Sequence, residues 1–169
     1  SARKGLEGVP WVARAAVTRH LPGTVRISVV EREPLATVAR AAGGLALVDG
    51  SGRVLVDSGE RPEGLPHLPG APEPPAPGGF LEGNRQPLAA VAALSPELRR
   101  MVDTSEEVAG LLVLRLRNGT EVRLGGPSEL RGKAAALEAV LGSLGDRRVS
   151  YVDVRVPTAP AVGPIPEKK

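Results

Sequence analysis

The sequence predicts an α+β fold with a mostly antiparallel sheet, and three observations lead to it. Segments with the two-residue period of a strand are mixed with segments of helical period, without the regular strand–helix–strand repeat of a parallel sheet. Apolar strands flank short connections that contain Gly, which is typical of antiparallel hairpins. The chain has 21 Gly and 17 Pro but only 2% aromatic residues, so we expect short elements around a core of Val, Leu, Ile and Ala.

The first part of the chain predicts a helix end and two strands. Pro10 interrupts the apolar segment 6–17, which indicates a helix end followed by a short extended link. The segment His-Leu-Pro-Gly at residues 20–23 predicts a turn. Residues 24–33 alternate like a half-buried strand, and residues 35–41 predict a second one. The side chains expected to face the core from the first strand are Val25, Ile27 and Val29.

The middle of the chain predicts a hairpin and a long crossing. Two apolar runs, residues 45–48 and 54–56, flank a Gly-rich connection and predict the hairpin. Residues 58–79 contain seven prolines, which favours an extended path over the surface. Within this crossing we expect Leu65 and Leu68 to touch the core.

The next segment contains the strongest local pattern of the sequence. Residues 88–98 predict an Ala-rich helix. Residues 113–117 and 120–124 alternate on either side of Asn118-Gly119. This dipeptide favours a type I′ turn, in which both central residues have positive φ, so the segment predicts a tight hairpin.

The last predicted helix covers residues 129–144, and Ser128 is its expected N-cap. A final strand is predicted over residues 149–156, with Val152, Val154 and Val156 facing the core. The residues that place one apolar face on the helix are Leu130, Ala134, Leu137, Leu141 and Leu144.

The sequence contains no recognisable catalytic or metal-binding constellation. The absence of Cys excludes disulfides, thiol catalysis and Cys-based zinc or iron–sulfur sites. His20 and His67 have no partner at metal-ligand spacing, and Ser51 lies outside a Gly-x-Ser-x-Gly motif. We therefore expect no enzymatic activity, no metal and no cofactor. The net charge of +3 is small and its charges are interspersed, so nucleic-acid binding is not expected either.

Residues 6–36, LEGVPWVARAAVTRHLPGTVRISVVEREPLA, resemble the second half of the POTRA domain in the FtsQ/DivIB family of bacterial cell-division proteins. Val9 replaces the leucine usual in that motif, and the first strand and helix of a complete POTRA domain have no counterpart. The residues at matching places are Pro10, Trp11, Val12, Val17, Arg19, Pro22, Thr24, Glu31, Arg32 and Pro34.

Four later segments resemble the β-domain of the same family, so the resemblance covers about residues 6 to 163. These segments are LALVDGSGRVL with Asp49 and Gly52, LPHLPG, LRLRNGTEVRLG and SYVDVRVPTAPAVG. Lys133 also stands where a helix lysine is common in the family. One departure is Pro157, which replaces an aromatic residue two places after the motif arginine.

The resemblance implies three parts: residues 1–42 as the C-terminal part of a POTRA domain, 43–160 as the β-domain and 161–169 as a Pro-rich flexible tail. A hinge is expected between the first two, near Arg40 to Gly44. Because no stretch of 18 apolar residues occurs and the chain starts without Met, we expect a membrane anchor upstream that is absent here.

The function implied by the resemblance is that of a non-catalytic divisome scaffold. Such a protein is held in the bacterial cell membrane by one transmembrane helix, with this part on the extracytoplasmic side at the division septum. Its implied partners are the FtsB/FtsL (DivIC/FtsL) pair, and FtsW and FtsI are further candidates. The alternatives are an exported α+β enzyme or carrier, or a POTRA-type translocation module. An upstream transmembrane helix would favour the scaffold, and a cleaved signal peptide would favour the alternatives.

The expected partner site lies on and after the last predicted strand, where a partner segment of acidic character would add along an open edge. An alternative for Arg155 is an internal ion pair with Asp153 or Glu121. The residues implied by the family to bind the partner are Tyr151, Arg155, Val156, Thr158, Ala159, Val162 and Gly163.

Overall fold

The computed structural model describes residue 5 and residues 8–164, and it begins with a two-stranded antiparallel hairpin. Strands β1 (Val12–His20) and β2 (Thr24–Glu31) pair from Arg14–Val30 to His20–Thr24, around the predicted turn. The extended link expected after Pro10 is therefore a full strand. The expected helix end falls partly on residues 6 and 7, which lie outside the described residues.

Strand β2 was predicted to be half-buried, but all of its residues are exposed. Val25, Ile27 and Val29 are all exposed, because no described element packs on the face of the hairpin that they share. Alternation in the sequence identified the strand, but burial depends on a second layer that period alone does not reveal.

A three-stranded antiparallel sheet follows, in the order β3 (Pro34–Ala39), β4 (Leu45–Asp49) and β5 (Val54–Ser58), which confirms the predicted hairpin at 45–56. Gly43 and Gly44 adopt positive φ in the turn between β3 and β4. The segment from Arg40 to Gly44 therefore lies inside a hairpin, and the connection from β2 to this sheet is Arg32–Glu33. The hinge expected near Arg40 to Gly44 is therefore not a link between two parts of the chain but the turn of a hairpin, which resembles a linker in its Gly-rich composition.

The Pro-rich crossing, residues 58–79, was expected to run over the surface, but part of it bonds to strands of both sheets. Its residues Pro66 to Leu68 lie between two strands, so that they join both sheets. On one side, Thr37 N–H donates to the Pro66 carbonyl at 2.9 Å and Leu68 N–H to the Thr37 carbonyl at 2.9 Å. On the other side, His67 N–H donates to the Asp103 carbonyl at 2.8 Å. Leu68 is buried in the core of the first sheet, which confirms its predicted contact, whereas Leu65 is only half-buried and does not belong to that core.

The single helix predicted over 88–98 is two helices, α2 (Arg85–Ala93) and α3 (Pro96–Met101). Pro96 disfavours a helical conformation at the residue before it, and Ser95 is extended, with φ −62° and ψ 157°. The Ser95 hydroxyl caps α3 by accepting a hydrogen bond from Leu98 N–H at 3.3 Å.

The second sheet has the strand order β10-β9-β8-β7-β6, and only β8 and β9 are parallel. Its strands are β6 (Val102–Val108), β7 (Leu111–Leu116), β8 (Glu121–Gly125), β9 (Tyr151–Asp153) and β10 (Ala161–Gly163). Together with the helices this confirms the α+β fold with mostly antiparallel sheets. Strands β6 and β10 were not predicted from the sequence.

The predicted hairpin at Asn118-Gly119 exists, but its turn type was wrong. Gly119 has φ 90° whereas Asn118 is not among the described residues with positive φ. Gly119 N–H donates to the Leu116 carbonyl, and Leu116 N–H to the Thr120 carbonyl, both at 2.9 Å, so the loop has three residues. A two-residue turn with positive φ at both positions occurs instead at Ala109-Gly110, between β6 and β7.

Helix α4 (Leu130–Leu144) packs on the second sheet. Leu137 is 0% exposed and Ala134 is buried beside it, which confirms the predicted apolar face. The predicted cap is wrong: Glu129 precedes the helix with φ 54° and makes no side-chain cap bond. The loop before the helix is held instead by the buried Lys133, whose Nζ donates to the Gly126 carbonyl at 2.7 Å.

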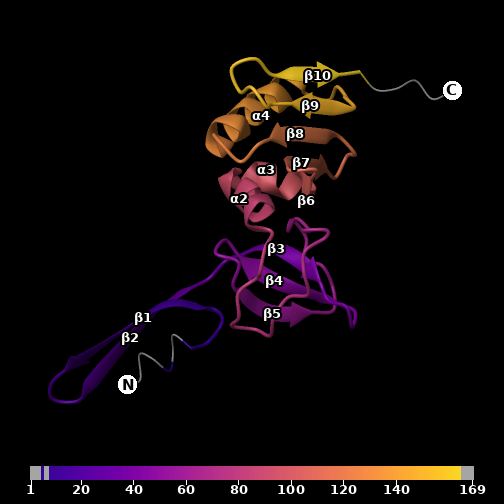
Figure 1. The fold of residues 1–169 in the computed structure, drawn as a ribbon. Coiled ribbons are helices and arrows are strands. Elements are labelled where there is room, and N and C mark those ends of the chain that lie inside the picture. The colour runs from indigo at the N-terminus through magenta and orange to yellow at the C-terminus, as the bar shows by residue number, and fades with distance from the viewer. Residues whose placement is uncertain (1–4, 6–7, 165–169) are drawn as a thin grey trace.

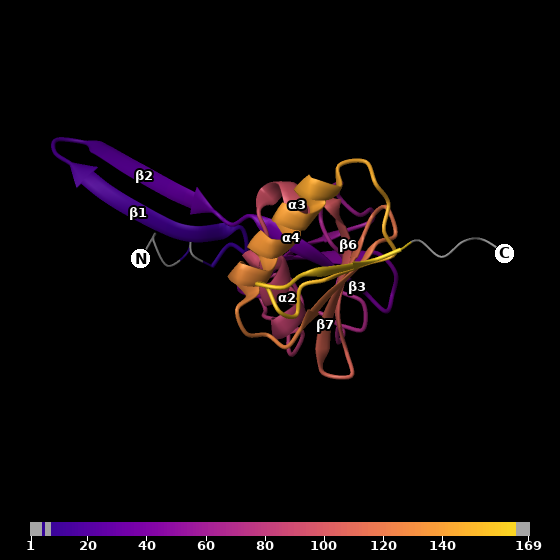
Figure 2. The same cartoon turned by 90° about the horizontal axis from the view of Figure 1, so that it is seen from above.

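The sheets and the bridging segment form one body from which the β1–β2 hairpin projects (Figure 1). Helices α2, α3 and α4 lie on one side of this body (Figure 2), so the outer face of the second sheet carries no helix.

Candidate partner-binding surface

The residues expected to bind a partner are brought together at one end of the second sheet, but not on one strand. Strand β9 ends at Asp153, and the chain turns back through Pro157 and Pro160 to form β10. Val156 is consequently 57% exposed instead of facing the core. Residues 161–163 form a strand where a flexible tail was expected. Of the seven expected site residues, Tyr151 lies on β9, Val162 and Gly163 on β10, and Arg155, Val156, Thr158 and Ala159 in the loop between them.

Strand β10 is the edge of the five-stranded sheet. It pairs on one side with β9, through Ala161–Asp153, Val162–Val152 and Gly163–Tyr151. No other described strand pairs with its outer side. An edge strand presents unpaired backbone N–H and C=O groups, so a further strand can add there. The edge predicted from the sequence therefore exists, but it belongs to β10 and not to β9.

A stack of side chains holds β10 in place. The ring of Tyr151 lies against Gly163, where an added Cβ would come within 2.0 Å of the ring. The guanidinium of Arg123 lies over the Tyr151 ring, with its central carbon 4.0 Å from the ring centroid. Arg123 Nε donates in turn to Glu121 Oε1 at 2.7 Å. Gly163 is thus buried beneath Tyr151, and it positions the edge strand by allowing this close approach.

Arg155 forms an ion pair with Asp153, one of the two alternatives left open by the sequence. Its Nε donates to Asp153 Oδ1 at 3.0 Å and its Nη2 to Asp153 Oδ2 at 2.7 Å. These hydrogen bonds hold the pKa of Asp153 below its usual value. The Arg155 side chain is nevertheless 57% exposed, against 13% for Asp153, so the guanidinium still faces solvent.

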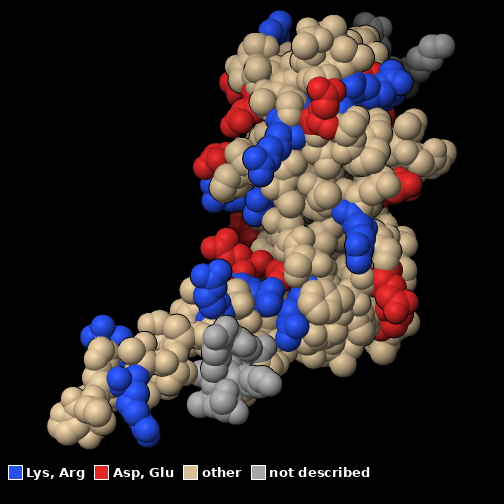
Figure 3. All heavy atoms as spheres, turned by 60° about the vertical axis from the view of Figure 1, so that its left-hand side comes forward, with Lys and Arg blue, Asp and Glu red and all other residues tan. Residues whose placement is uncertain are grey.

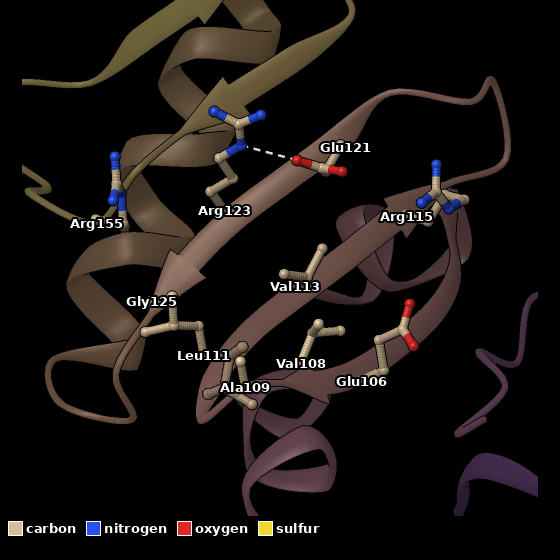
Figure 4. A pocket seen from close by; sticks show the side chains of 11 residues that line it. Glu106, Val108, Ala109, Leu111, Val113, Arg115, Glu121, Arg123, Gly125 and Arg155 are labelled. Atoms are coloured by element: carbon tan, nitrogen blue, oxygen red, sulfur yellow. Dashed lines mark hydrogen bonds and ion pairs between the residues drawn. The ribbon is translucent and has the colours of Figure 1, made fainter. Parts of the chain in front are cut away.

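A groove runs along the outer face of the second sheet from the β6–β7 turn to Arg155 (Figure 4). Its floor is apolar, and Val108 and Leu111 are among the large hydrophobic residues exposed to solvent. The charged residues that border it are Glu106, Arg115, Glu121, Arg123 and Arg155.

Arg155 also lines a second, smaller hollow with Asp153, Val156, Ala159 and Ala161, beside β10. The groove and the edge strand therefore meet at one arginine. The groove was not predicted from the sequence, because β6 contains one Asp and two Glu, residue types that are depleted in strands. The apolar segment Val108-Ala109-Gly110-Leu111 was the available signal.

The comparison with known families assigns most of the chain. Residues 36–155 match the family described as cell division protein FtsQ/DivIB, C-terminal, and residues 1–32 match the FtsQ-type POTRA domain. This chain belongs to the FtsQ/DivIB family. The resemblance recognised in the sequence is thereby confirmed, and the groove, Tyr151 and Arg155 all lie within the matched part of this FtsQ/DivIB chain.

Among the relatives, the cell division protein FtsQ of Corynebacterium glutamicum is 28% identical over 155 residues, which cover 87% of this chain and 65% of the relative. FtsQ of Neisseria meningitidis serogroup B is 31% identical over 156 residues, with 91% and 62% covered. The chain thus spans just under two thirds of the length of these FtsQ relatives.

One solved structure that is similar to this chain is the major extracytoplasmic domain of the trans isomer of the cell division protein DivIB from Geobacillus stearothermophilus. Its superposition on this chain has a TM-score of 0.47 with 15% sequence identity, and it covers 70% of this chain and 98% of the DivIB chain.

The described part of this FtsQ/DivIB chain contains no group of three or more His, Asp or Glu side chains placed to hold a metal ion. Within the same residues, no helix is long and apolar enough to cross a membrane.

Proposed function

We propose that this FtsQ/DivIB chain is a non-catalytic scaffold of cell division that binds the FtsB/FtsL (DivIC/FtsL) pair through the edge of β10. The observation that carries the proposal is the open β10 edge, which meets an apolar groove at Arg155. An edge strand gives affinity through backbone hydrogen bonds, and the side chains beside it give specificity.

Arg155 supports an acidic partner segment. Asp153 engages its Nε and Nη2, so Nη1 can donate to a carboxylate of the partner in a charge-assisted bond. Such a bond would fix the register of the added strand. The prior pairing with Asp153 orients the guanidinium, which reduces the entropy lost on binding.

The groove extends the same surface. A partner that adds a strand at β10 and continues across the outer face would meet Arg155 first and then the apolar floor near Leu111. The groove borders hold three arginines and two glutamates, and one of these, Glu121, is paired with Arg123. This balance again favours a partner with acidic side chains flanking apolar ones.

The setting of the scaffold belongs to the same proposal, and membership of the family supports it. The intact protein is held in the bacterial cell membrane by a single transmembrane helix upstream of this part, which lies on the extracytoplasmic side at the septum. FtsW and FtsI are further proposed partners. The scaffold would link early and late septum assembly and regulate septal peptidoglycan synthesis.

Calorimetry with the FtsB/FtsL homologues tests the binding role. Arg155→Glu should weaken binding at least tenfold, because it replaces a donor at the junction of edge and groove by a repelling charge. The matched control is Arg131→Glu, which makes the same charge change at an exposed position on α4. Circular dichroism checks that both variants fold. Equal affinity of the Arg155 variant and the control would remove Arg155 from the site, and no binding by the parent chain would overturn the scaffold proposal.

A further inference from the structure

The tip of the β1–β2 hairpin is the most exposed apolar point of the described chain. Leu21, in the turn between the two strands, is 89% exposed, more than any other large hydrophobic residue described. The hairpin projects from the body with this turn at its far end (Figure 1). A single large apolar side chain at the end of a projecting ribbon is placed to insert into a surface that the ribbon contacts with its end.

The projecting part of the hairpin carries only basic charges. Residues 8–30 contain Arg14, Arg19 and Arg26 and no Asp or Glu, and the one acidic residue of the two strands, Glu31, lies at the end of β2 away from the turn. These three charges equal the net charge of +3 of the whole chain. On the side seen in Figure 3, the projecting hairpin shows Lys and Arg but no Asp or Glu. The rest of the chain is balanced, so the positive charge is concentrated at the projecting end.

Strand register places two of these arginines around the tip. Arg19 lies opposite Val25, and Arg26 lies opposite Thr18. Residues directly opposite each other share a face of an antiparallel ribbon, and neighbouring pairs lie on alternate faces. Arg19 and Arg26 therefore project from opposite faces, within about two or three residues of the turn. The ribbon ends in an apolar point with one guanidinium on each side.

We propose that this tip docks end-on to an anionic lipid surface. Leu21 enters the boundary between headgroups and acyl chains, and Arg19 and Arg26 bind lipid phosphates on either side. A protein partner would be expected to use one face or one edge of the ribbon, whereas cations on both faces around an apolar end fit a plane approached from its end. The valines further from the turn are not needed for this contact.

The inference goes beyond the proposed scaffold role but relies on its membrane setting. Two or three arginines bind an anionic membrane weakly on their own. For a protein already attached to that membrane, the contact becomes intramolecular, and weak binding suffices to fix orientation. Docking the tip would hold the hairpin against the membrane and thereby orient the body that carries β10.

The absence of Cys allows a direct test with one added thiol. Gly23→Cys places a label at the tip, where an added Cβ meets nothing within 4 Å and φ is ordinary. Gly142→Cys on α4 is the matched control, with equally open surroundings. Each 169-residue variant is labelled with the environment-sensitive dye NBD and titrated with vesicles of phosphatidylcholine mixed with phosphatidylglycerol, or of phosphatidylcholine alone.

We expect NBD emission to shift to shorter wavelength at the tip only, and with the anionic vesicles only. Arg19→Ala with Arg26→Ala should weaken the partition about twenty-five-fold, since each basic residue near an anionic surface contributes roughly fivefold. Arg131→Ala with Arg148→Ala, the matched pair on the body, should change it little, and added salt should weaken it.

No shift at the tip, an equal shift at both labels, or equal loss in both arginine pairs would overturn the inference. Calorimetry of the same variants with FtsB/FtsL separates the two proposals, because loss of lipid binding with intact partner binding would leave the scaffold role standing.

Discussion

Gly163→Ala is the substitution that most sharply tests how the edge strand is held. An alanine Cβ at this position would lie 2.0 Å from Tyr151 Cε1 and 2.4 Å from Cδ1. The ring would have to retreat by more than an ångström to reach ordinary contact, and this movement disrupts its 4.0 Å contact with the Arg123 guanidinium. Overpacking of this kind costs about 1–3 kcal/mol.

A double-mutant cycle assigns that cost to the ring. Urea unfolding of Gly163→Ala should show a loss of about 1–3 kcal/mol, whereas the same substitution in a Tyr151→Ala background should cost much less, because the space is then empty. The reasoning is refuted if Gly163→Ala costs the same in both backgrounds, since the destabilisation would then have a source other than Tyr151.

Two further predictions concern the cores and the pH dependence. Leu137→Ala should lower the free energy of unfolding by about 2–5 kcal/mol because Leu137 is fully buried, and Leu141→Ala should cost less because its side chain is half-buried; equal losses would contradict the packing of α4. For Asp49, burial raises the pKa, but hydrogen bonds from Ser51, Arg32 and Arg53 outweigh it and hold the pKa below its usual value. Its contribution to stability is therefore present above the unfolded pKa of about 4 and is lost as the pH falls through the lower folded pKa. Denaturant unfolding from pH 7 to pH 2 should show Asp49→Asn less stable than the parent, with the difference shrinking below about pH 4, and a constant difference would count against this role.

Local sequence patterns predicted the elements whose partners are close in the chain. The hairpin at 45–56 is set by apolar runs around a Gly-rich connection, and the core face of α4 by the spacing of its leucines. The break between α2 and α3 was also accessible, because Pro96 disfavours helix at Ser95. The type I′ turn was predicted at Asn118-Gly119, but the hydrogen bonds between Leu116 and Thr120 and between Gly119 and Leu116 close a three-residue loop there.

The incorrect predictions concern elements whose structure depends on contacts between residues far apart in the sequence. Strand β10 has three residues between prolines and gains its structure from pairing with β9. His67 joins two sheets through backbone bonds, but Pro66 and Pro69 flank it, and the segment forms only the isolated bridges to Thr37 and Thr104, so it has no strand period in the sequence. Val25, Ile27 and Val29 alternate like core residues, yet no described layer covers them.

The candidate site was predicted in part. The family resemblance indicated Tyr151 and Arg155, and the structure places both beside an open sheet edge. The Arg155–Asp153 ion pair was one of two alternatives that spacing could not separate, because either acceptor lies within reach of a long side chain. The groove depends on β6, whose polar sequence does not identify it as a strand.

Hydrogen exchange of the segment 158–164, measured with and without the FtsB/FtsL homologues, tests the central claim most directly. If a partner strand adds to β10, amide exchange in Ala161–Gly163 should slow on binding, while exchange in residues 85–93 of α2 stays unchanged. Binding without added protection of the β10 amides would contradict strand addition at this edge.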